Sequence, residues 1–194
     1  MKTIEFYTTK SGSGDFTNMK KHVWELDGQL NIDDLLKMKE FSNFKLAATI
    51  VEDSNTSGYK IKLEDFFVGK PFVIYLLVKD GKVLKGGKSK NTLDSRSYSA
   101  GTEESWTNRG TPSVTNYVWS QIFRESLKDG KPILFYGYVV PSYELTYPSF
   151  DGEVVTEMVC GHYETEELKL NHLLSKLNGR KVIGEGKLLE LNKK

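Results

Sequence analysis

Alternating apolar and polar positions predict the first strands of the chain. The alternation runs over residues 45–51 and 59–63, with the polar segment EDSNTSG as the loop between them. A third apolar run, FVIYLLV, is partly β-branched and ends at Asp80-Gly81, a pair that favours a two-residue hairpin turn. KVLKGG follows as the return strand, so the pattern predicts an antiparallel hairpin here.

Helical patterns lie on both sides of this hairpin. IDDLLKMKE, around residues 33 to 41, favours a helix, and NTLDSRSYS favours a short helix capped by Asn91. A longer helix is predicted from Val114 to Lys128, and a last one in ETEELKLNHLLSKLNG, which starts with acids and ends with glycine. Apolar residues at helical spacing mark their inner faces: Val114, Val118, Ile122 and Leu127, then Leu170, Leu173, Leu174 and Leu177.

The segment between the last two helices predicts further strands. PILFYGYVV reads as a strand, PSYELTYPSFDG as a turn-rich excursion, and EVVTEMVC as a hairpin partner or neighbour of the preceding strand. The elements together predict an α+β fold with a small antiparallel sheet flanked by helices.

Composition limits the class of protein. The 194 residues suit one domain, 38% of them are apolar, and no apolar run approaches the roughly 18 residues of a membrane span. The first residues lack the apolar core of a secretory signal, and the single Cys160 cannot form an internal disulfide, so we expect a cytoplasmic protein without a membrane role. One cysteine and three scattered histidines also exclude zinc-type spacing, which leaves carboxylates as ligands for any metal.

Charge is clustered although the formal net charge is only +1. Residues 79–96 carry six cations and two acids, whereas residues 133–168 carry seven acids and no lysine or arginine. A clustered basic surface suits a phosphate backbone. A solvated, lysine-rich hairpin is an equally good explanation of the charge alone.

The same hairpin resembles the core of the GIY-YIG nucleases. Val73-Ile74-Tyr75 stands where that family has G-I-Y, and Lys85-Gly86-Gly87, ten residues on, stands where it has Y-I-G. Some GIY-YIG restriction endonucleases are similar in placing a lysine at the second tyrosine and an arginine eleven residues later, as Arg96 follows Lys85. The resemblance covers roughly residues 70 to 185. It divides the chain into an N-terminal extension, 1–69, which is an arm or an added layer, and a nuclease core, 70–194.

The resemblance implies roles for these residues. Tyr75 would activate the water nucleophile, Lys85 would favour the deprotonated phenol, and Arg96 would neutralise the developing charge on phosphorus. Four further residues of the hairpin would contact DNA: Gly86, Gly87, Lys88 and Lys90. Each residue has a structural alternative, because a strand tyrosine is often a core residue, glycines permit tight strand exits, and surface lysines are often only solvated.

A metal-binding glutamate early in the last helix is also implied by the resemblance. Glu164, Glu166 and Glu167 compete for this role. We expect Glu166, which has leucines at helical spacing and lies twelve residues before Asn178, with Glu167 in reserve and Glu164 as a helix cap. The ion would be Mg²⁺ or Mn²⁺.

These features predict a metal-dependent endonuclease that hydrolyses DNA, most simply a restriction-type enzyme acting on duplex DNA as a homodimer. The resemblance to the GIY-YIG nucleases implies products with 5′-phosphate and 3′-hydroxyl ends. The alternatives are a phage or mobile-element nuclease, a non-catalytic nucleic-acid-binding module, and a structural protein in which these residues only fill core and surface.

Overall fold

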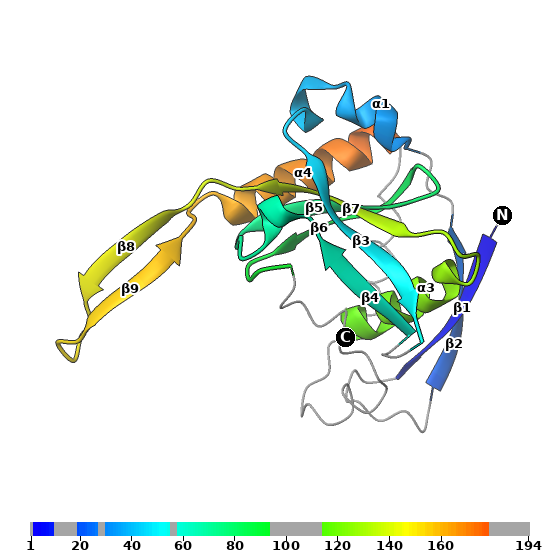
Figure 1. The fold of residues 1–194 in the computed structure, drawn as a ribbon, viewed down its shortest axis with the longest axis horizontal. Helices are drawn as coiled ribbons and strands as arrows, with labels where there is room; N and C mark the ends of the chain where they lie inside the picture. Colours follow the sequence, from blue (N-terminus) through cyan, green and yellow to red (C-terminus); the bar gives the residue numbers. More distant parts are fainter. Residues whose placement is uncertain (1, 10–18, 27–29, 55–57, 94–113, 179–194) are drawn as a thin grey trace.

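A computed structural model of the chain describes residues 2–9, 19–26, 30–54, 58–93 and 114–178. The backbone of the first two ranges forms a hairpin of strands β1 (Lys2–Thr9) and β2 (Met19–Leu26). This hairpin lies against helix α3 (Val114–Leu127), on the side of the molecule opposite the long yellow hairpin (Figure 1). It is separate from the central sheet.

The central sheet has five strands in the order β4-β3-β7-β5-β6, and every neighbouring pair is antiparallel. Its strands are β3 (Lys45–Asp53), β4 (Gly58–Leu63), β5 (Val73–Lys79), β6 (Lys82–Ser89) and β7 (Ile133–Val139). All seven residues of β5 are buried, including Lys79. Strand β6 lies at one end of the sheet, so its outer side is not paired with another described strand.

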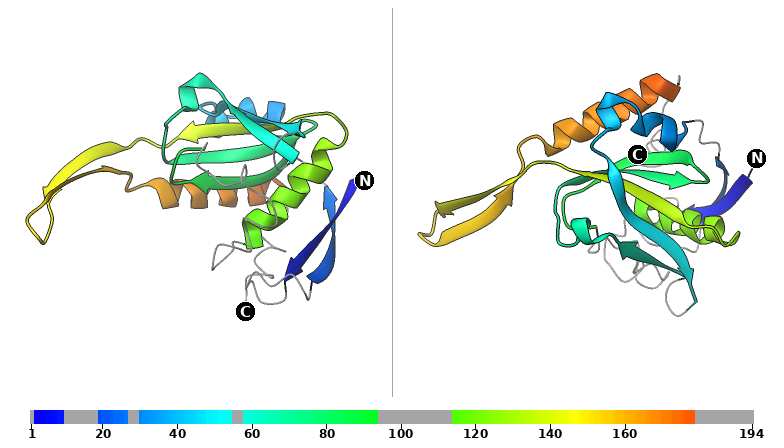
Figure 2. Two further views of the ribbon diagram at one scale, coloured as in Figure 1. Left: turned by 60° about the horizontal axis from the view of Figure 1, so that its bottom comes forward. Right: turned by 45° about the horizontal axis from the view of Figure 1, so that its top comes forward.

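Helices cover both faces of the sheet, and each face has its own hydrophobic core (Figure 2). On one face α3 brings Trp119, Ile122 and Phe123 onto the side chains of β3, β5 and β7. On the other, helix α4 (Tyr163–Asn178) packs with α1 (Ile32–Leu36) and the 3₁₀ turn η2 (Lys39–Phe41). The predicted α+β fold with helices flanking an antiparallel sheet is confirmed.

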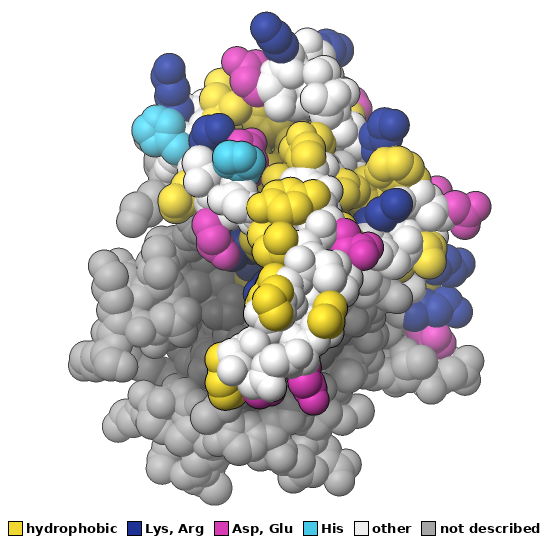
Figure 3. Space-filling model, turned by 90° about the vertical axis from the view of Figure 1, so that its left-hand side faces the viewer, with side chains coloured by type: hydrophobic (Ala, Val, Ile, Leu, Met, Phe, Trp, Pro, Cys, Tyr) yellow, Lys and Arg dark blue, Asp and Glu magenta, His cyan; other side chains and the backbone are white. Residues whose placement is uncertain are grey.

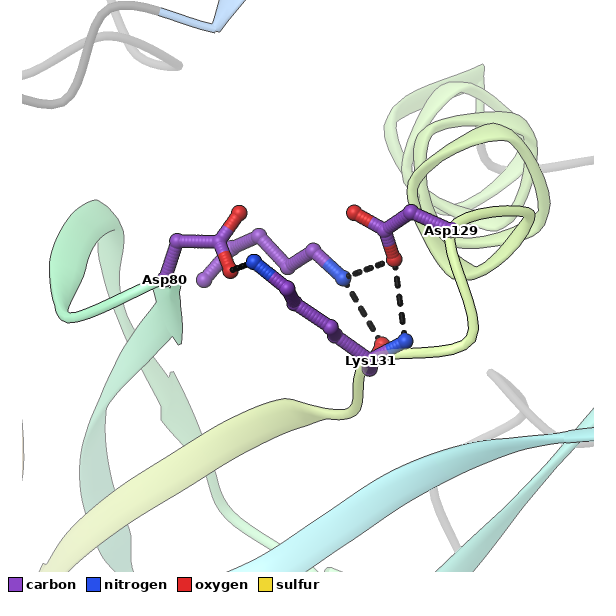
Figure 4. Close-up of polar contacts among 4 residues, drawn as sticks. Asp80, Asp129 and Lys131 are labelled. Atoms are coloured by element: carbon purple, nitrogen blue, oxygen red, sulfur yellow. Dashed lines mark hydrogen bonds and ion pairs between the residues drawn. The ribbon is translucent and has the colours of Figure 1, made fainter.

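The turn between β5 and β6 is the one that Asp80-Gly81 predicts. Both residues have positive φ, 49° and 73°, the combination that a type I′ hairpin turn requires. Just before the turn, Lys79 is buried and its Nζ lies 2.7 Å from both Asp129 Oδ1 and the Lys131 carbonyl oxygen. Lys131 in turn donates from Nζ to Asp80 Oδ1, so these four residues tie the hairpin to the α3–β7 loop (Figure 4).

The segment after β7 differs from its prediction. PSYELTYPSFDG contains a strand, β8 (Tyr143–Pro148), and EVVTEMVC forms β9 (Val154–Val159), which pairs with β8 and not with β7. The two strands form a hairpin that stands out from the body (Figure 1). Turn-forming residues such as Pro148 lie at its end, where a proline is tolerated because the outer N–H positions need no partner.

The leucine spacing of α4 meets the structure only in part. Leu170 and Leu174 of α4 are buried, but Leu177 is exposed, so the inner face of α4 is shorter than the leucine spacing suggests. The sheet also crosses the boundary drawn at residues 69 and 70, because β3 and β4 of the N-terminal segment pair within it. In the described residues, no helix is long and apolar enough to cross a membrane.

Candidate active site on the β5–β6 hairpin

A β-bulge decides which way Lys85 points. From the turn outwards Val78 pairs with Val83, but the next pair is Leu77 with Lys85, so Leu84 is an extra residue on β6. Without this shift Lys85 would stand opposite Leu76, on the α4 face of the sheet. The bulge turns Lys85 to the α3 face, where Tyr75 and Leu77 also lie.

Tyr75 and Lys85 are therefore diagonal neighbours on one face of the hairpin, an arrangement that brings side chains within about 7–8 Å of each other. Lys85 is half-buried, and its Nζ lies 5.1 Å from the centre of the Trp119 ring in α3, a cation–π contact. Tyr75 is fully buried, and its ring centre lies 5.0 Å from that of Phe135. Trp119 is not among the residues expected from the sequence, because nothing in its spacing links α3 to β6.

The two glycines of β6 serve opposite faces of the sheet. Gly87 pairs with Tyr75, and a Cβ placed on it would lie 2.7 Å from the Tyr75 hydroxyl oxygen. Gly86 faces α4, where a Cβ would lie 2.8 Å from Leu174 Cδ1 and 2.9 Å from Asn171 Oδ1. Gly87 thus makes room for the phenol, and Gly86 makes room for the last helix.

Lys88 lies on the α4 face, where two carboxylates meet its ammonium group. Its Nζ pairs with Glu164 Oε2 and lies 2.6 Å from Glu167 Oε2 and 5.7 Å from the centre of the Tyr163 ring. Burial lowers the pKa of Lys88, but hydrogen bonds and attraction from Glu167 and Glu164 outweigh it and hold the pKa above its usual value. Lys88 is therefore a paired cation and not a solvated one.

Glu166 points elsewhere on α4. It pairs with Lys169 at 2.7 Å and lines a cavity of about 290 Å³ between α4 and η2, together with Phe41, Phe44 and Tyr138. Its side chain is 30% exposed, whereas that of Glu167, turned to the edge strand, is 17% exposed. Of the three glutamates, Glu164 and Glu167 approach β6 and Glu166 does not.

The remaining candidate residues, Lys90 and Arg96, are not part of the geometry described above. Lys90 is exposed just beyond the end of β6, and Arg96 lies outside the described residues. No cluster of three or more histidine, cysteine or acidic side chains suited to a metal occurs in the ranges that the structure describes. The candidate site thus centres on Gly87 and Lys88 of the edge strand, with Tyr75 and Lys85 on one face and Glu164 and Glu167 on the other.

Comparison with known proteins finds a likeness of structure. No protein-family model matches the sequence, and no curated protein matches it either. The chain is similar in fold to restriction endonuclease HPY188I. In the solved structure of that enzyme in complex with product DNA, the likeness covers 82% of this chain and 87% of that chain, with 25% identity and a TM-score of 0.52. A mutant of bacteriophage T4 EndoII is also similar, at 19% identity over 78% of this chain and 97% of that one, with a TM-score of 0.49.

Proposed function

We propose that this protein is a metal-dependent DNA endonuclease of the restriction type, with a GIY-YIG-like core in which lysine replaces the second tyrosine. The observation that carries the proposal is the bulge that brings Lys85 to the face of Tyr75 on an antiparallel hairpin. The likeness to HPY188I, a restriction endonuclease solved with product DNA, supports the choice of substrate and reaction class.

In the proposed reaction, water attacks phosphorus and one of its protons passes to the Tyr75 phenolate, while the bond to the 3′ oxygen breaks and that oxygen takes up a proton from solvent. Lys85 favours the deprotonated phenol through its positive charge, so a larger fraction of Tyr75 is present as the phenolate that can accept a proton. Arg96, seven residues beyond the end of β6 in the sequence, is proposed to bind the non-bridging phosphate oxygens. Because Tyr75 is fully buried, substrate reaches its hydroxyl only after a local rearrangement exposes it.

The carboxylates of α4 fit a divalent cation. Glu164 and Glu167 direct one oxygen each at the Lys88 ammonium, so their oxygens are close enough to share a positive charge. Mg²⁺ commonly takes one or two carboxylates and fills its other positions with water and phosphate. We therefore propose Glu167, with Glu164 beside it, as the ligand for Mg²⁺ or Mn²⁺, in preference to Glu166. When bound, such an ion would act as a Lewis acid toward the leaving oxygen.

Incubation with supercoiled plasmid DNA, with and without Mg²⁺, tests the proposal. Wild-type protein should cut the plasmid only with the metal. In Tyr75→Phe the ring is retained and the hydroxyl is lost, so cleavage should fall by about 10² or more, the usual scale for an acid–base group. Tyr136→Phe is the matched control, because Tyr136 belongs to the core on the opposite face and should be dispensable for cleavage.

Full activity of a folded Tyr75→Phe protein would disprove the assignment of the nucleophile's activator. A second candidate function, DNA binding without hydrolysis, is favoured by the complete burial of Tyr75. It predicts that the wild-type protein retards DNA in a gel but does not cut it at any Mg²⁺ or Mn²⁺ concentration.

A further inference from the structure

Two lysines of the β5–β6 hairpin form ion pairs of different kinds. The side chain of Lys79 is 4% exposed, and its Nζ lies 2.7 Å from Asp129 Oδ1 inside the protein. The side chain of Lys88 is 29% exposed, and its carboxylate partners Glu164 and Glu167 are 72% and 17% exposed. Ion pairs that reach solvent stabilise a fold little, because water competes for both charges. The ammonium of Lys79 is therefore held in place, whereas that of Lys88 can leave its partners at small cost.

The Lys88 ammonium lies where a metal bound by the same two carboxylates would lie. Its Nζ pairs with Oε2 of Glu164 and lies 2.6 Å from Oε2 of Glu167. A Mg²⁺ ion bound to both oxygens would stand at about 2.0–2.1 Å from each of them. An ammonium and a divalent ion cannot share this position, and at such short range their charges repel each other. The ammonium must therefore leave before both carboxylates can bind a metal.

The charge that remains around Lys88 still attracts a divalent cation. Lys88 neutralises only one of its two carboxylate partners, so the three side chains together are negatively charged. Glu166 does not change this balance, because it is paired with Lys169. Among the described side chains on the side from which the β8–β9 hairpin projects, acids lie interspersed with lysines and arginines (Figure 3). A divalent cation in solution therefore meets no continuous basic surface among these described side chains.

A DNA phosphate is a suitable second partner for the displaced ammonium. Lys88 belongs to the edge strand β6, whose outer side is not paired with another described strand. The two residues before it, Gly86 and Gly87, have no side chains that could obstruct this edge. A lysine carries its charge on a flexible four-carbon stem, so the ammonium can move while the backbone stays in place. A phosphate backbone along β6 would offer it a charge-assisted hydrogen bond in exchange for the one it loses.

We propose that Lys88 is an exchangeable cation that couples metal binding to DNA binding. Without DNA its ammonium occupies the pair of Glu164 and Glu167, and when DNA binds it moves to a backbone phosphate and leaves the carboxylates to Mg²⁺ or Mn²⁺. This inference rests on the proposed function for the choice of DNA and metal. Binding couplings are reciprocal, so the metal raises the affinity for DNA by the factor by which DNA raises the affinity for the metal. The exchange keeps the affinity for the metal low until substrate is present.

Titration with Mn²⁺ in the absence of DNA, followed by electron paramagnetic resonance, tests the exchange without reference to catalysis. Lys88→Met removes the competing ammonium, so the dissociation constant of Mn²⁺ should fall about ten-fold, within the usual range of binding couplings. Lys88→Gln should show the same fall. The matched control is Lys90→Met, which removes the same charge from an exposed side chain on the same strand edge. It should change the constant less than about two-fold, because salt screens an exposed charge.

Adding Glu167→Gln to Lys88→Met should abolish the gain in Mn²⁺ affinity, because the carboxylate that Lys88 releases is then lost. Persistence of the gain in this double variant would place the metal elsewhere and overturn the proposal.

Retardation of DNA at several salt concentrations tests where the ammonium goes. These measurements use the Tyr75→Phe background, which keeps the DNA intact. With Mn²⁺ present, Lys88→Met should reduce the slope of log affinity against log salt by about 0.9, the value for one phosphate contact. With a chelator in place of the metal, the slope should be the same with and without Lys88, because Glu164 and Glu167 then hold its ammonium.

Equal Mn²⁺ affinities of the wild-type and Lys88→Met proteins would overturn the proposal, as would an equal gain in Lys90→Met. An equal reduction of the salt slope with chelator and with Mn²⁺ would also overturn it, because Lys88 would then be a permanent phosphate contact. A protein that does not retard DNA at all would remove the partner of the exchange. The expected Mn²⁺ and DNA results without any cleavage would support the exchange and disprove the proposed hydrolysis.

Discussion

A single extra residue, Leu84, decides on which face of the hairpin the side chain of Lys85 lies. It lets Lys85 stand opposite Leu77 and so share a sheet face with Tyr75, while the next residues alternate between the two faces. Gly87 falls opposite Tyr75, where the phenol leaves no room for a side chain. The face of the sheet on which each β6 side chain lies therefore depends on the bulge.

Gly87→Ala should damage both stability and cleavage. The added Cβ would lie 2.7 Å from the hydroxyl oxygen and Cζ of Tyr75, and the buried ring cannot move aside cheaply. Overpacking of this kind typically costs about 1–3 kcal/mol, which should appear as a lower melting temperature. Gly161→Ala, with no atom within 4 Å of its Cβ, is the control and should melt close to the wild-type protein. Equal melting temperatures for the two variants would mean that Tyr75 is not held against Gly87.

Glu167→Gln should abolish metal binding, whereas Glu166→Gln should have a small effect. Glutamine keeps the shape of the side chain but removes the anion, and only Glu167 of this pair is directed at the edge strand. Mn²⁺ affinity, followed by electron paramagnetic resonance, gives a measurement that does not require activity. Loss of Mn²⁺ binding in Glu166→Gln alone would restore the original expectation from the leucine spacing.

At the scale of elements, consecutive residues of α4 face different parts of the molecule. Successive residues of a helix are turned by about 100°, so Glu166 faces η2 and its aromatic residues while Glu167 faces β6. The leucine pattern correctly predicted the helix and its buried Leu170 and Leu174. It could not show which flank of that buried stripe would meet β6, because that depends on how the helix lies on the sheet.

The hairpin of β8 and β9 contains a pair of side chains, Tyr147 and Glu157, whose contribution to stability depends on pH. Tyr147 donates a hydrogen bond to Glu157, and this bond, with the carboxylate's charge, raises the pKa of Tyr147 above its usual value. Because the pKa is higher in the folded state than in the unfolded state, the pair stabilises the β8–β9 hairpin fully at pH values below the unfolded pKa of tyrosine. This stabilisation is lost as the pH rises through the folded-state pKa. In Glu157→Gln the Tyr147 ring resonances should titrate at lower pH than in the wild-type protein. Identical titration curves from nuclear magnetic resonance would contradict the pair.

For the whole molecule, the sheet joins segments far apart in the sequence. Strand β3 pairs with β7, and β7 pairs with β5, so the strands of the N-terminal segment and those of the nuclease core form one continuous sheet. Ala47, Ile50, Tyr59 and Phe67 of the N-terminal segment are buried in the same core as Tyr75. Removal of that segment would expose one side of β7 and one side of the core.

A chain that starts at Val68 should therefore fail to fold. It lacks β3, β4 and the Phe41 and Phe44 side chains that pack on the opposite face, so it loses buried surface from both cores. Circular dichroism and thermal melting would show no cooperative transition. A chain that starts at Gln29 keeps the entire central sheet and should melt cooperatively. Cooperative melting of the Val68 chain with unchanged cleavage would show that residues 1–67 are a dispensable extension.

The sequence by itself determined the local features of this protein. Asp80-Gly81 specified the turn because its residues tolerate positive φ, the apolar run of β5 specified a buried strand, and leucines at helical spacing specified α4. These are properties of neighbouring residues, so their physical causes lie within a short window. The resemblance of the hairpin to the GIY-YIG nucleases likewise rests on a few residues within one such window.

Only the tertiary structure decided the rest. The way in which strands and helices far apart in sequence pack together decided the bulge at Leu84, the contact of Lys85 with Trp119 and the direction of Glu167 toward β6. The hairpin of β8 and β9 is a second example. Its turn-rich sequence did not indicate strand β8, which pairs with β9 and is exposed along its whole length. Packing between distant segments sets free energies that no local pattern contains.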